Sequence, residues 1–187
     1  MVRLILASSS PRRKELLQLL RVTFETIPPI GVKEELSTYF DPEELADLSF
    51  RKARNVYERY PDAVIIGADT VVVLENTVMG KPSSKDEAFE MLVRLSEKMH
   101  YVFTSVSVLE RRWNFSFIER TAVKFRRIPL TLIGEYVQTG IPLDKAGAYG
   151  IQDYGALFTE SINGDYYNVM GLPIGRLWQE LHTRGVI

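Results

Sequence analysis

Cysteine is absent from this chain of 187 residues, and histidine occurs only twice. Without cysteine there are no disulfides, no thiol nucleophile and no thiolate-bound metal. No other histidine accompanies His100 or His182, so we expect neither a zinc site with several histidines nor a catalytic triad that includes histidine. A catalytic metal would therefore need carboxylate ligands, and these favour Mg²⁺ or Mn²⁺.

Long apolar runs and a large net charge are also missing. No apolar stretch is long enough to span a bilayer, and the run at 4–7 is too short for the hydrophobic part of a signal peptide. We therefore expect a cytoplasmic protein that does not insert into membranes. The formal net charge of -1 argues against a dedicated nucleic-acid coat, so a polyanion would have to bind in a local basic pocket.

The order of the expected elements indicates an α/β fold. Strands are predicted at 2–7, 22–27, 63–74, 101–109, 115–119 and 122–128. Helices are predicted at 11–20, 42–60, 131–138, from residue 84 onward, and after the sequence Gly-Leu-Pro at 171–173. The pair Asn163-Gly164 predicts a tight hairpin between two strands. We expect a single domain over residues 1–187, with a large mixed and twisted sheet flanked by helices.

Basic residues follow the start of the first predicted helix. Ser10 is a good N-cap residue, and Pro11 suits the first helical position. The next residues are Arg12, Arg13 and Lys14, although acidic residues would suit the helix dipole there. Backbone N–H groups, serine hydroxyls and guanidinium groups that converge in this way are typical of a phosphate site. The alternative is that the basic side chains extend into solvent.

A carboxylate and a lysine interrupt apolar patterns. Asp69 lies within the apolar run at 64–73, so it must meet a cation, a metal or hydrogen-bond donors. It is either a functional group or a structural carboxylate tied to an arginine or to turn amides. Gly67 and Ala68 leave room beside it for a ligand or another backbone. Lys52 lies in the centre of the apolar stripe of its predicted helix, so its amine reaches either solvent or an internal anion.

Four further residues carry weaker signals. Lys81 stands in a rigid turn between glycine and proline, either as a phosphate clamp or as an ordinary surface lysine. Glu34 and Glu35 lie in an irregular loop, where they either bind a metal or face solvent. Gln152 ends a glycine-rich loop and either reads the edge of a base or caps a turn. Together with the stronger signals, these residues predict a pocket for a polyphosphate and a hard divalent ion.

Five short segments carry a family resemblance. In chain order they are LASSSPRR at 6–13, GADTVV at 67–72, GKP at 80–82, DKAGAYGIQ at 144–152 and ING at 162–164. Together they resemble the Maf family of nucleotide pyrophosphatases. The resemblance implies an ITPase-like fold and hydrolysis of a nucleoside triphosphate between its α- and β-phosphates, with Mg²⁺ or Mn²⁺ as cofactor. It also implies the branch that prefers dTTP and UTP over the branch that prefers 7-methyl-GTP.

The resemblance further implies a role for each candidate residue. Asp69 accepts a proton from the attacking water and lies near the metal, whose further ligand is Glu34 or Glu35. The implied substrate-binding residues are Ser8, Arg12, Arg13, Lys52 and Lys81, and the implied specificity residues are Arg12, Thr70 and Gln152. Members of this family are cytoplasmic, often homodimeric and without a stable nucleic-acid partner. They remove surplus or modified nucleotides and are linked to cell-division arrest.

Two other functions remain open on the sequence. One is a non-catalytic regulator of septum formation that binds nucleotide or nucleic acid in the same basic pocket. Asp69 argues against it, because a carboxylate repels a phosphate ligand unless a metal lies between them. The other is a pyrophosphatase for purine analogues such as ITP, which only a comparison of substrates separates from the first reading.

Overall fold

Seven strands form one mixed sheet in the computed structural model, which describes residues 2–187. The strands are β1 (Leu4–Ala7), β2 (Glu25–Thr26), β3 (Val64–Leu74), β4 (Thr77–Met79), β5 (Met99–Glu110), β6 (Trp113–Phe125) and β7 (Thr159–Asn163). Their order is β2-β1-β3-β5-β6-β7, and β4 pairs with β3. The pairs of β1 with β2 and β3 are parallel, whereas the other pairs are antiparallel. The predicted α/β class with a mixed sheet is confirmed.

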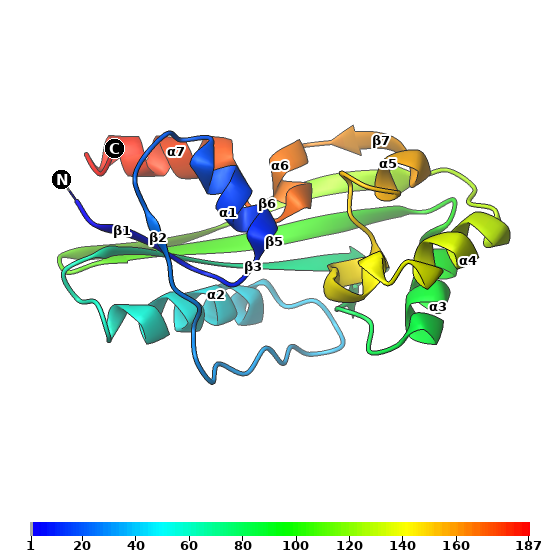
Figure 1. The fold of residues 1–187 in the computed structure, drawn as a ribbon, viewed down its shortest axis with the longest axis horizontal. Coiled ribbons are helices and arrows are strands. Elements are labelled where there is room, and N and C mark those ends of the chain that lie inside the picture. The colour runs from blue at the N-terminus through cyan, green and yellow to red at the C-terminus, as the bar shows by residue number, and fades with distance from the viewer. Residues whose placement is uncertain (1) are drawn as a thin grey trace.

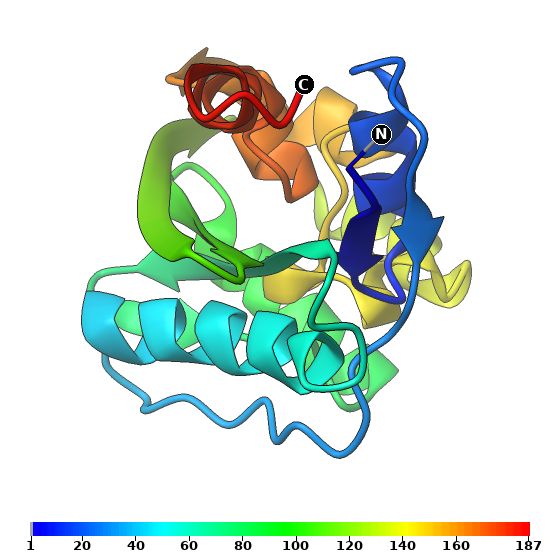
Figure 2. The same ribbon diagram turned by 90° about the vertical axis from the view of Figure 1, so that its left-hand side faces the viewer.

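Helices cover both faces of the sheet. They are α1 (Pro11–Gln18), α2 (Pro42–Tyr57), α3 (Lys85–Leu95), α4 (Leu130–Gln138), α5 (Gly155–Phe158), α6 (Tyr166–Met170) and α7 (Ile174–Thr183), with 3-10 turns η1 (Ile141–Asp144) and η2 (Ala146–Ala148). Helix α2 lies along one face, while α1, α6 and α7 lie on the other (Figure 1). The end-on view in Figure 2 shows the sheet between α2 and α7. Helices α3, α4 and α5 gather at the end of the sheet opposite the chain termini (Figure 1). No helix within residues 2–187 combines the length and apolar character that crossing a bilayer requires.

Several predicted elements differ from the structure. The expected hairpin at Asn163-Gly164 is wrong: β7 ends at Asn163, and the side chain of Asp165 accepts a hydrogen bond from the Tyr167 N–H to cap α6. An aspartate just after the turn therefore starts a helix where a second strand was expected. The strands expected at 115–119 and 122–128 are one strand, β6, because β5 pairs with it without interruption from Glu110 to Met99. Strand β2 is only two residues long.

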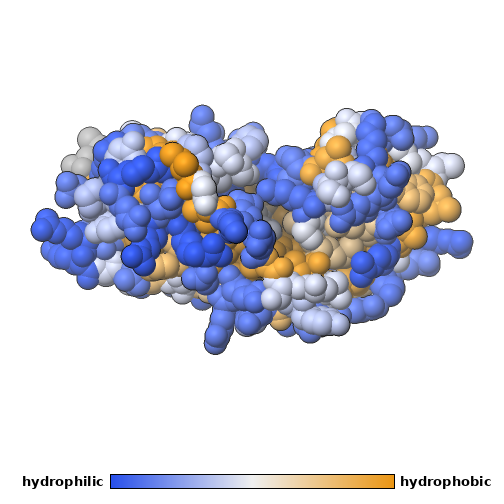
Figure 3. All heavy atoms as spheres, turned by 90° about the horizontal axis from the view of Figure 1, so that it is seen from below, coloured by the Kyte–Doolittle hydropathy of each residue, from blue (hydrophilic) through white to orange (hydrophobic). Residues whose placement is uncertain are grey.

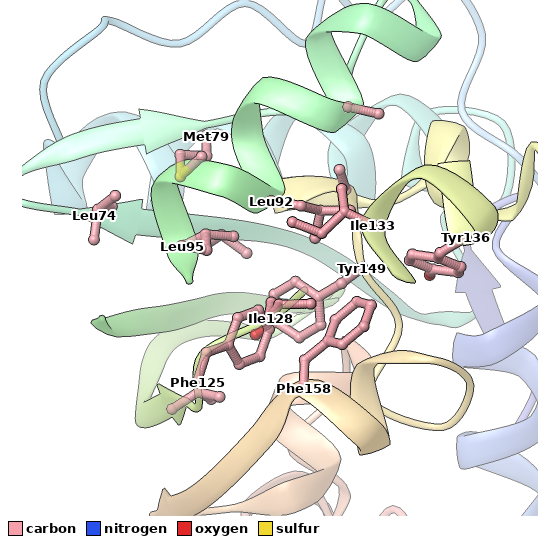
Figure 4. Packing of buried hydrophobic residues seen from close by; sticks show 14 of the residues in the cluster. Leu74, Met79, Leu92, Leu95, Phe125, Ile128, Ile133, Tyr136, Tyr149 and Phe158 are labelled. Atoms are coloured by element: carbon pink, nitrogen blue, oxygen red, sulfur yellow. The ribbon is translucent and has the colours of Figure 1, made fainter. Parts of the chain in front are cut away.

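The apolar core at the α3–α4 end holds the glycine-rich loop in place. Tyr149, which belongs to this loop, packs edge-on against Phe125, with 4.8 Å between the ring centroids. Phe125 also packs against Phe158 at 5.8 Å, and the three rings lie close together beneath α3 and α4 (Figure 4). His100 is buried among them, and its Nε2 lies 2.8 Å from the Tyr149 hydroxyl. The loop that contains residues 144–152 is thus anchored by aromatic packing.

Candidate active site

The residues to which the sequence analysis gave a role in the site all line one pocket of about 790 Å³. They are Ser8, Arg12, Arg13, Glu34, Glu35, Lys52, Asp69, Thr70, Lys81 and Gln152. Strand β1, helices α1 and α2, strand β3 and the glycine-rich loop each contribute to the lining. Seen from the α2 side, the surface is indented between the two ends of the molecule, and hydrophilic side chains cover much of both ends (Figure 3). The structure therefore brings together residues that lie up to 144 positions apart, from Ser8 to Gln152.

A close contact between α2 and β3 places Lys52 in this pocket. A Cβ atom added to Gly67 of β3 would lie 2.5 Å from the Ser49 carbonyl oxygen and 2.7 Å from the Ala53 nitrogen. Helix α2 thus lies directly on the strand where glycine has no side chain. The space that Gly67 leaves is filled by another backbone, which is one of the two possibilities the sequence left open. Lys52 lies in the same turn of α2 as Ser49 and Ala53, so its side chain faces β3. There it reaches Asp69, which is two residues beyond Gly67.

Lys52 and Asp69 form a nearly buried ion pair. The Lys52 Nζ lies 2.5 Å from Oδ1 of Asp69, and the two side chains are only 5% and 14% exposed. The same Nζ lies 2.8 Å from Oε1 of Glu34, and the Lys81 Nζ lies 3.6 Å from Oε2 of Glu34. Partial burial acts to raise the pKa of Glu34, but the hydrogen bond from Lys52 and the charges of Lys52, Lys81 and Arg13 outweigh it and lower the pKa. Of the two outcomes that the sequence left open for the Lys52 amine, solvent or an internal anion, the structure shows the internal anion.

The start of α1 forms another wall of the pocket. Ser10 caps the helix by accepting a hydrogen bond from the Arg13 N–H, and the first turn contains no acidic residue. Ser8, which is buried, accepts a hydrogen bond from the Ser10 N–H at 3.1 Å. Arg13 donates from Nε to the Gly171 carbonyl at 2.9 Å and from Nη2 to the Thr70 hydroxyl at 3.0 Å. Burial lowers the pKa of Arg13, and the negative charge of Asp69 counters part of this effect. The guanidinium is thus held against β3 and the end of α6.

The predicted specificity residues lie on different parts of the pocket lining. Arg12 reaches across to the glycine-rich loop, where its Nη1 lies 3.0 Å from Oδ2 of Asp144. Gln152 is exposed at the other end of that loop. Thr70 is partly buried on β3, where its hydroxyl lies 2.9 Å from the Thr104 hydroxyl. Arg12 and Gln152 thus lie at the more open part of the pocket lining, whereas the Thr70 hydroxyl is engaged by Arg13 and Thr104.

Two charged residues of the glycine-rich loop were not assigned a role from the sequence. Asp144 pairs with Arg12, and Lys145 is buried and pairs with Asp144 at 2.7 Å. The loop also reaches the turn that carries Lys81, because the Gly147 N–H donates to the Gly80 carbonyl at 3.0 Å. The sequence does contain a feature that could have indicated them, because two opposite charges stand side by side at the start of a loop rich in glycine and alanine.

The carboxylates of the pocket suit a metal ion that arrives with a substrate. Within residues 2–187, no group of three or more histidine, aspartate or glutamate side chains could hold a metal. A site preformed by Glu34, Glu35 and Asp69 together is thus absent, and the structure pairs Glu34 with Asp69 through Lys52. Mg²⁺ often binds through one or two carboxylates, several waters and the phosphates of a substrate. The donor set of Glu34 and Asp69 fits that mode.

Comparisons with known proteins show the family to which this chain belongs. The family model described as Maf-like protein matches residues 3–184. A dTTP/UTP pyrophosphatase of Thermosipho melanesiensis is 48% identical, over 98% of this chain and 99% of that protein. A dTTP/UTP pyrophosphatase of Thermotoga maritima is 45% identical, over 98% of this chain and 90% of that protein. In fold alone, the chain is similar to a HAM1 protein from Coxiella burnetii, with a TM-score of 0.56 and 14% identity over 98% of this chain and 100% of that one. This chain belongs to the Maf family.

Proposed function

We propose that this protein hydrolyses dTTP and UTP to the nucleoside monophosphate and pyrophosphate, and that it also acts on modified pyrimidine nucleotides. The observation that carries the proposal is the nearly buried pair of Lys52 and Asp69 in a pocket that also holds the basic start of α1. A pocket that only bound phosphate would gain nothing from a carboxylate. The names of the relatives support the same reaction and the same two nucleotides.

The triphosphate binds to cations that converge from separate elements. Arg12 and Arg13 lie in the first turn of α1, where the helix dipole also favours an anion. Lys52 and Lys81 approach from α2 and from the turn after β4, and both contact Glu34. A phosphate that displaces Glu34 from Lys81 would gain that cation without moving the buried Lys52. The buried hydroxyl of Ser8 lines the same wall.

Asp69 activates the water in this proposal. The water oxygen forms a bond to the α-phosphorus, and the bond from that phosphorus to the bridging oxygen breaks. The electron pair leaves with pyrophosphate, and the water proton goes to the carboxylate of Asp69. Lys52, at 2.5 Å from Oδ1, orients the carboxylate and holds a positive charge beside the reacting groups. Glu34 and Asp69 would hold a divalent Mg²⁺ or Mn²⁺ ion, which supplies charge neutralisation at the phosphates and a more acidic water.

The base is read at the rim of the pocket. Arg12 and Gln152 are the accessible polar groups for the edge of a pyrimidine, and Thr70, the third specificity residue of this proposal, lines the same pocket and accepts a hydrogen bond from Arg13. A cytoplasmic location, a homodimer and a role in cell-division arrest stay predictions from the family resemblance.

Pyrophosphate release by Asp69→Asn tests the proposal. The substitution keeps the size of the side chain but removes the base, so we expect kcat for dTTP to fall about 10²- to 10⁴-fold. Asp62→Asn changes an exposed carboxylate outside the pocket and is the matched control. The panel contains dTTP, UTP, dCTP and ITP, each with Mg²⁺, with Mn²⁺ and with a chelator. Near-normal turnover by Asp69→Asn would remove Asp69 from the mechanism. Salt-sensitive binding of nucleic acid without any hydrolysis would favour the regulator instead.

A further inference from the structure

Lys145 is a buried lysine that the proposed reaction does not use. It stands between η1 and η2, and its side chain is only 10% exposed. The Nζ donates to the Ile141 carbonyl at 2.6 Å and to Oδ1 of Asp144 at 2.7 Å. It also lies 3.8 Å from Oδ2 of Asp153. Lysine is seldom buried unless it is paired, and here one ammonium lies between two carboxylates.

One of these carboxylates connects Lys145 to Arg12. Asp144 uses Oδ1 for Lys145 and Oδ2 for the Arg12 Nη1, which lies at 3.0 Å. The Arg12 Nη2 also donates to the backbone carbonyl of Asp144 at 3.4 Å. Partial burial acts to raise the pKa of Asp144, but the hydrogen bonds and charges of Lys145 and Arg12 outweigh it, so its pKa is lowered. Asp144 thus remains ionised and holds both cations.

The other carboxylate connects Lys145 to the segment that carries Gln152. Asp153 follows Gln152 directly, and its Oδ1 accepts a hydrogen bond from the Tyr136 hydroxyl at 2.7 Å. The Gly150 N–H donates to the same hydroxyl at 3.2 Å. A Cβ atom added to Gly150 would lie 2.8 Å from Cε of Lys145, so the loop backbone packs on the lysine stem. Gly150 and Asp153, which lie on either side of the pair Ile151-Gln152, are therefore both held by Lys145 and Tyr136.

We propose that Lys145 is a positioning residue for base recognition. It holds Arg12 through Asp144 and Gln152 through Asp153, so one buried cation sets the relative position of both groups that read the base. This inference rests on the proposed function. It predicts that removal of the Lys145 charge impairs the choice of base more than the chemistry at the phosphates, because its contacts are Ile141, Asp144 and Asp153, in and next to the glycine-rich loop, and not Lys52 or Asp69.

The test compares Lys145→Met with Lys145→Arg and with Lys98→Met. Methionine keeps the unbranched stem without the charge, whereas arginine restores a cation. Lys98 pairs with Glu75 on the surface, and neither of these residues lines the pocket, so this variant controls for the loss of one positive charge. For each protein, kcat and KM are measured with dTTP, with dCTP and with methyl triphosphate, which has no base. The expected result is a fall of about 10- to 100-fold in the dTTP-to-dCTP ratio of kcat/KM for Lys145→Met, chiefly through KM for dTTP. The ratio is expected to recover in Lys145→Arg and to stay at the wild-type value in Lys98→Met.

Other results would overturn the inference. A folded Lys145→Met with the wild-type ratio would show that Lys145 does not position the base-reading groups. An equal loss with dTTP, dCTP and methyl triphosphate would assign it a general structural role. If Lys145→Met does not fold, Asp153→Asn takes its place, because the amide keeps the shape but loses the attraction to Lys145. Calorimetric binding of the α,β-methylene analogues of dTTP and dCTP keeps the two proposals separate. Absence of hydrolysis by the wild type would refute the proposed function, while the ratio of dissociation constants would still decide the role of Lys145.

Discussion

Gly67→Ala is the substitution that most directly tests how this site is built. The glycine lies in β3, paired with Ala7 of β1 and Ser107 of β5, so the strand cannot move aside easily. An added Cβ would lie 2.5 Å from the Ser49 carbonyl oxygen and 2.7 Å from the Ala53 nitrogen. Both atoms belong to the backbone of α2, so no side-chain rotation relieves the contact.

The size of the effect can be worked out from these distances. A contact of 2.5 Å is 0.9 Å short of the 3.4 Å at which ordinary van der Waals contact begins, so α2 has to move by about that amount. Overpacking of this kind costs about 1–3 kcal/mol. For a domain of this size, that range corresponds to a fall of about 2–12 °C in the melting temperature. The movement also carries Lys52 away from Asp69, and a displacement of about 1 Å in a catalytic group costs roughly 10²-fold in turnover.

Gly134→Ala is the matched control for this prediction. Gly134 lies within α4, and a Cβ added there meets no heavy atom within 4 Å. Because alanine favours a helix over glycine by about 1 kcal/mol, this variant should be slightly more stable than the wild type and fully active. Thermal unfolding and pyrophosphate release from dTTP are measured for both. If Gly67→Ala matches the wild type in melting temperature and in turnover, close contact between α2 and β3 does not position the Lys52–Asp69 pair.

The buried polar groups and the carboxylates give three further predictions. Burial lowers the pKa of His100 from 6.5 to about 4, so the unfolded chain binds more protons between these values, and stability should fall by up to about 3 kcal/mol as the pH drops through that window. Urea unfolding at pH 7.5, 5.5 and 4.5 should show a smaller fall in the free energy of unfolding for His100→Leu than for the wild type. Equal falls in the two proteins would show that His100 does not cause this loss of stability. Tyr136→Phe leaves Asp153 and the Gly150 N–H without a hydroxyl partner and should cost about 1–3 kcal/mol, whereas the exposed Tyr166→Phe should cost almost nothing; equal urea midpoints would contradict this. Removal of divalent ions with a chelator should abolish pyrophosphate release, restorable by Mg²⁺ or Mn²⁺, and turnover that persists in the chelator would exclude the proposed metal.

Local patterns in the sequence predicted part of the pocket lining, because those patterns depend only on neighbours in the chain. Ser10 and Pro11 define the start of α1, and the helix begins there. The phase of Lys52 within α2 placed it on the apolar stripe, and the ion pair with Asp69 decides between the two outcomes that this left open, solvent or an internal anion. These inferences need only helical periodicity and the cost of burying a charge.

Long-range contacts could not be predicted in the same way. The pair of Arg12 with Asp144 spans 132 residues, and no local rule relates the first turn of α1 to a loop that lies five strands further along the chain. The expected hairpin at Asn163-Gly164 failed for a related reason: the dipeptide predicts a sharp turn, but Asp165 and the packing of α6 determine that a helix comes after it. The turn could be predicted from neighbouring residues, whereas the element that follows it could not.

The contrast between Lys52 and Lys145 shows which buried charges can be predicted from the sequence and which cannot. Both are buried lysines that bridge two carboxylates. Lys52 stands out in the sequence because it interrupts the apolar stripe of a helix. A charged residue at an apolar position can be recognised even when the carboxylates that pair with it are unknown. Lys145 lies in a loop, where no periodicity exists for it to break, so only the folded chain shows that it is enclosed. Sequence patterns therefore reveal a functional charge where the periodicity of a helix or strand predicts an apolar residue at that position. In loops such as 144–152, the same chemistry becomes evident only from contacts.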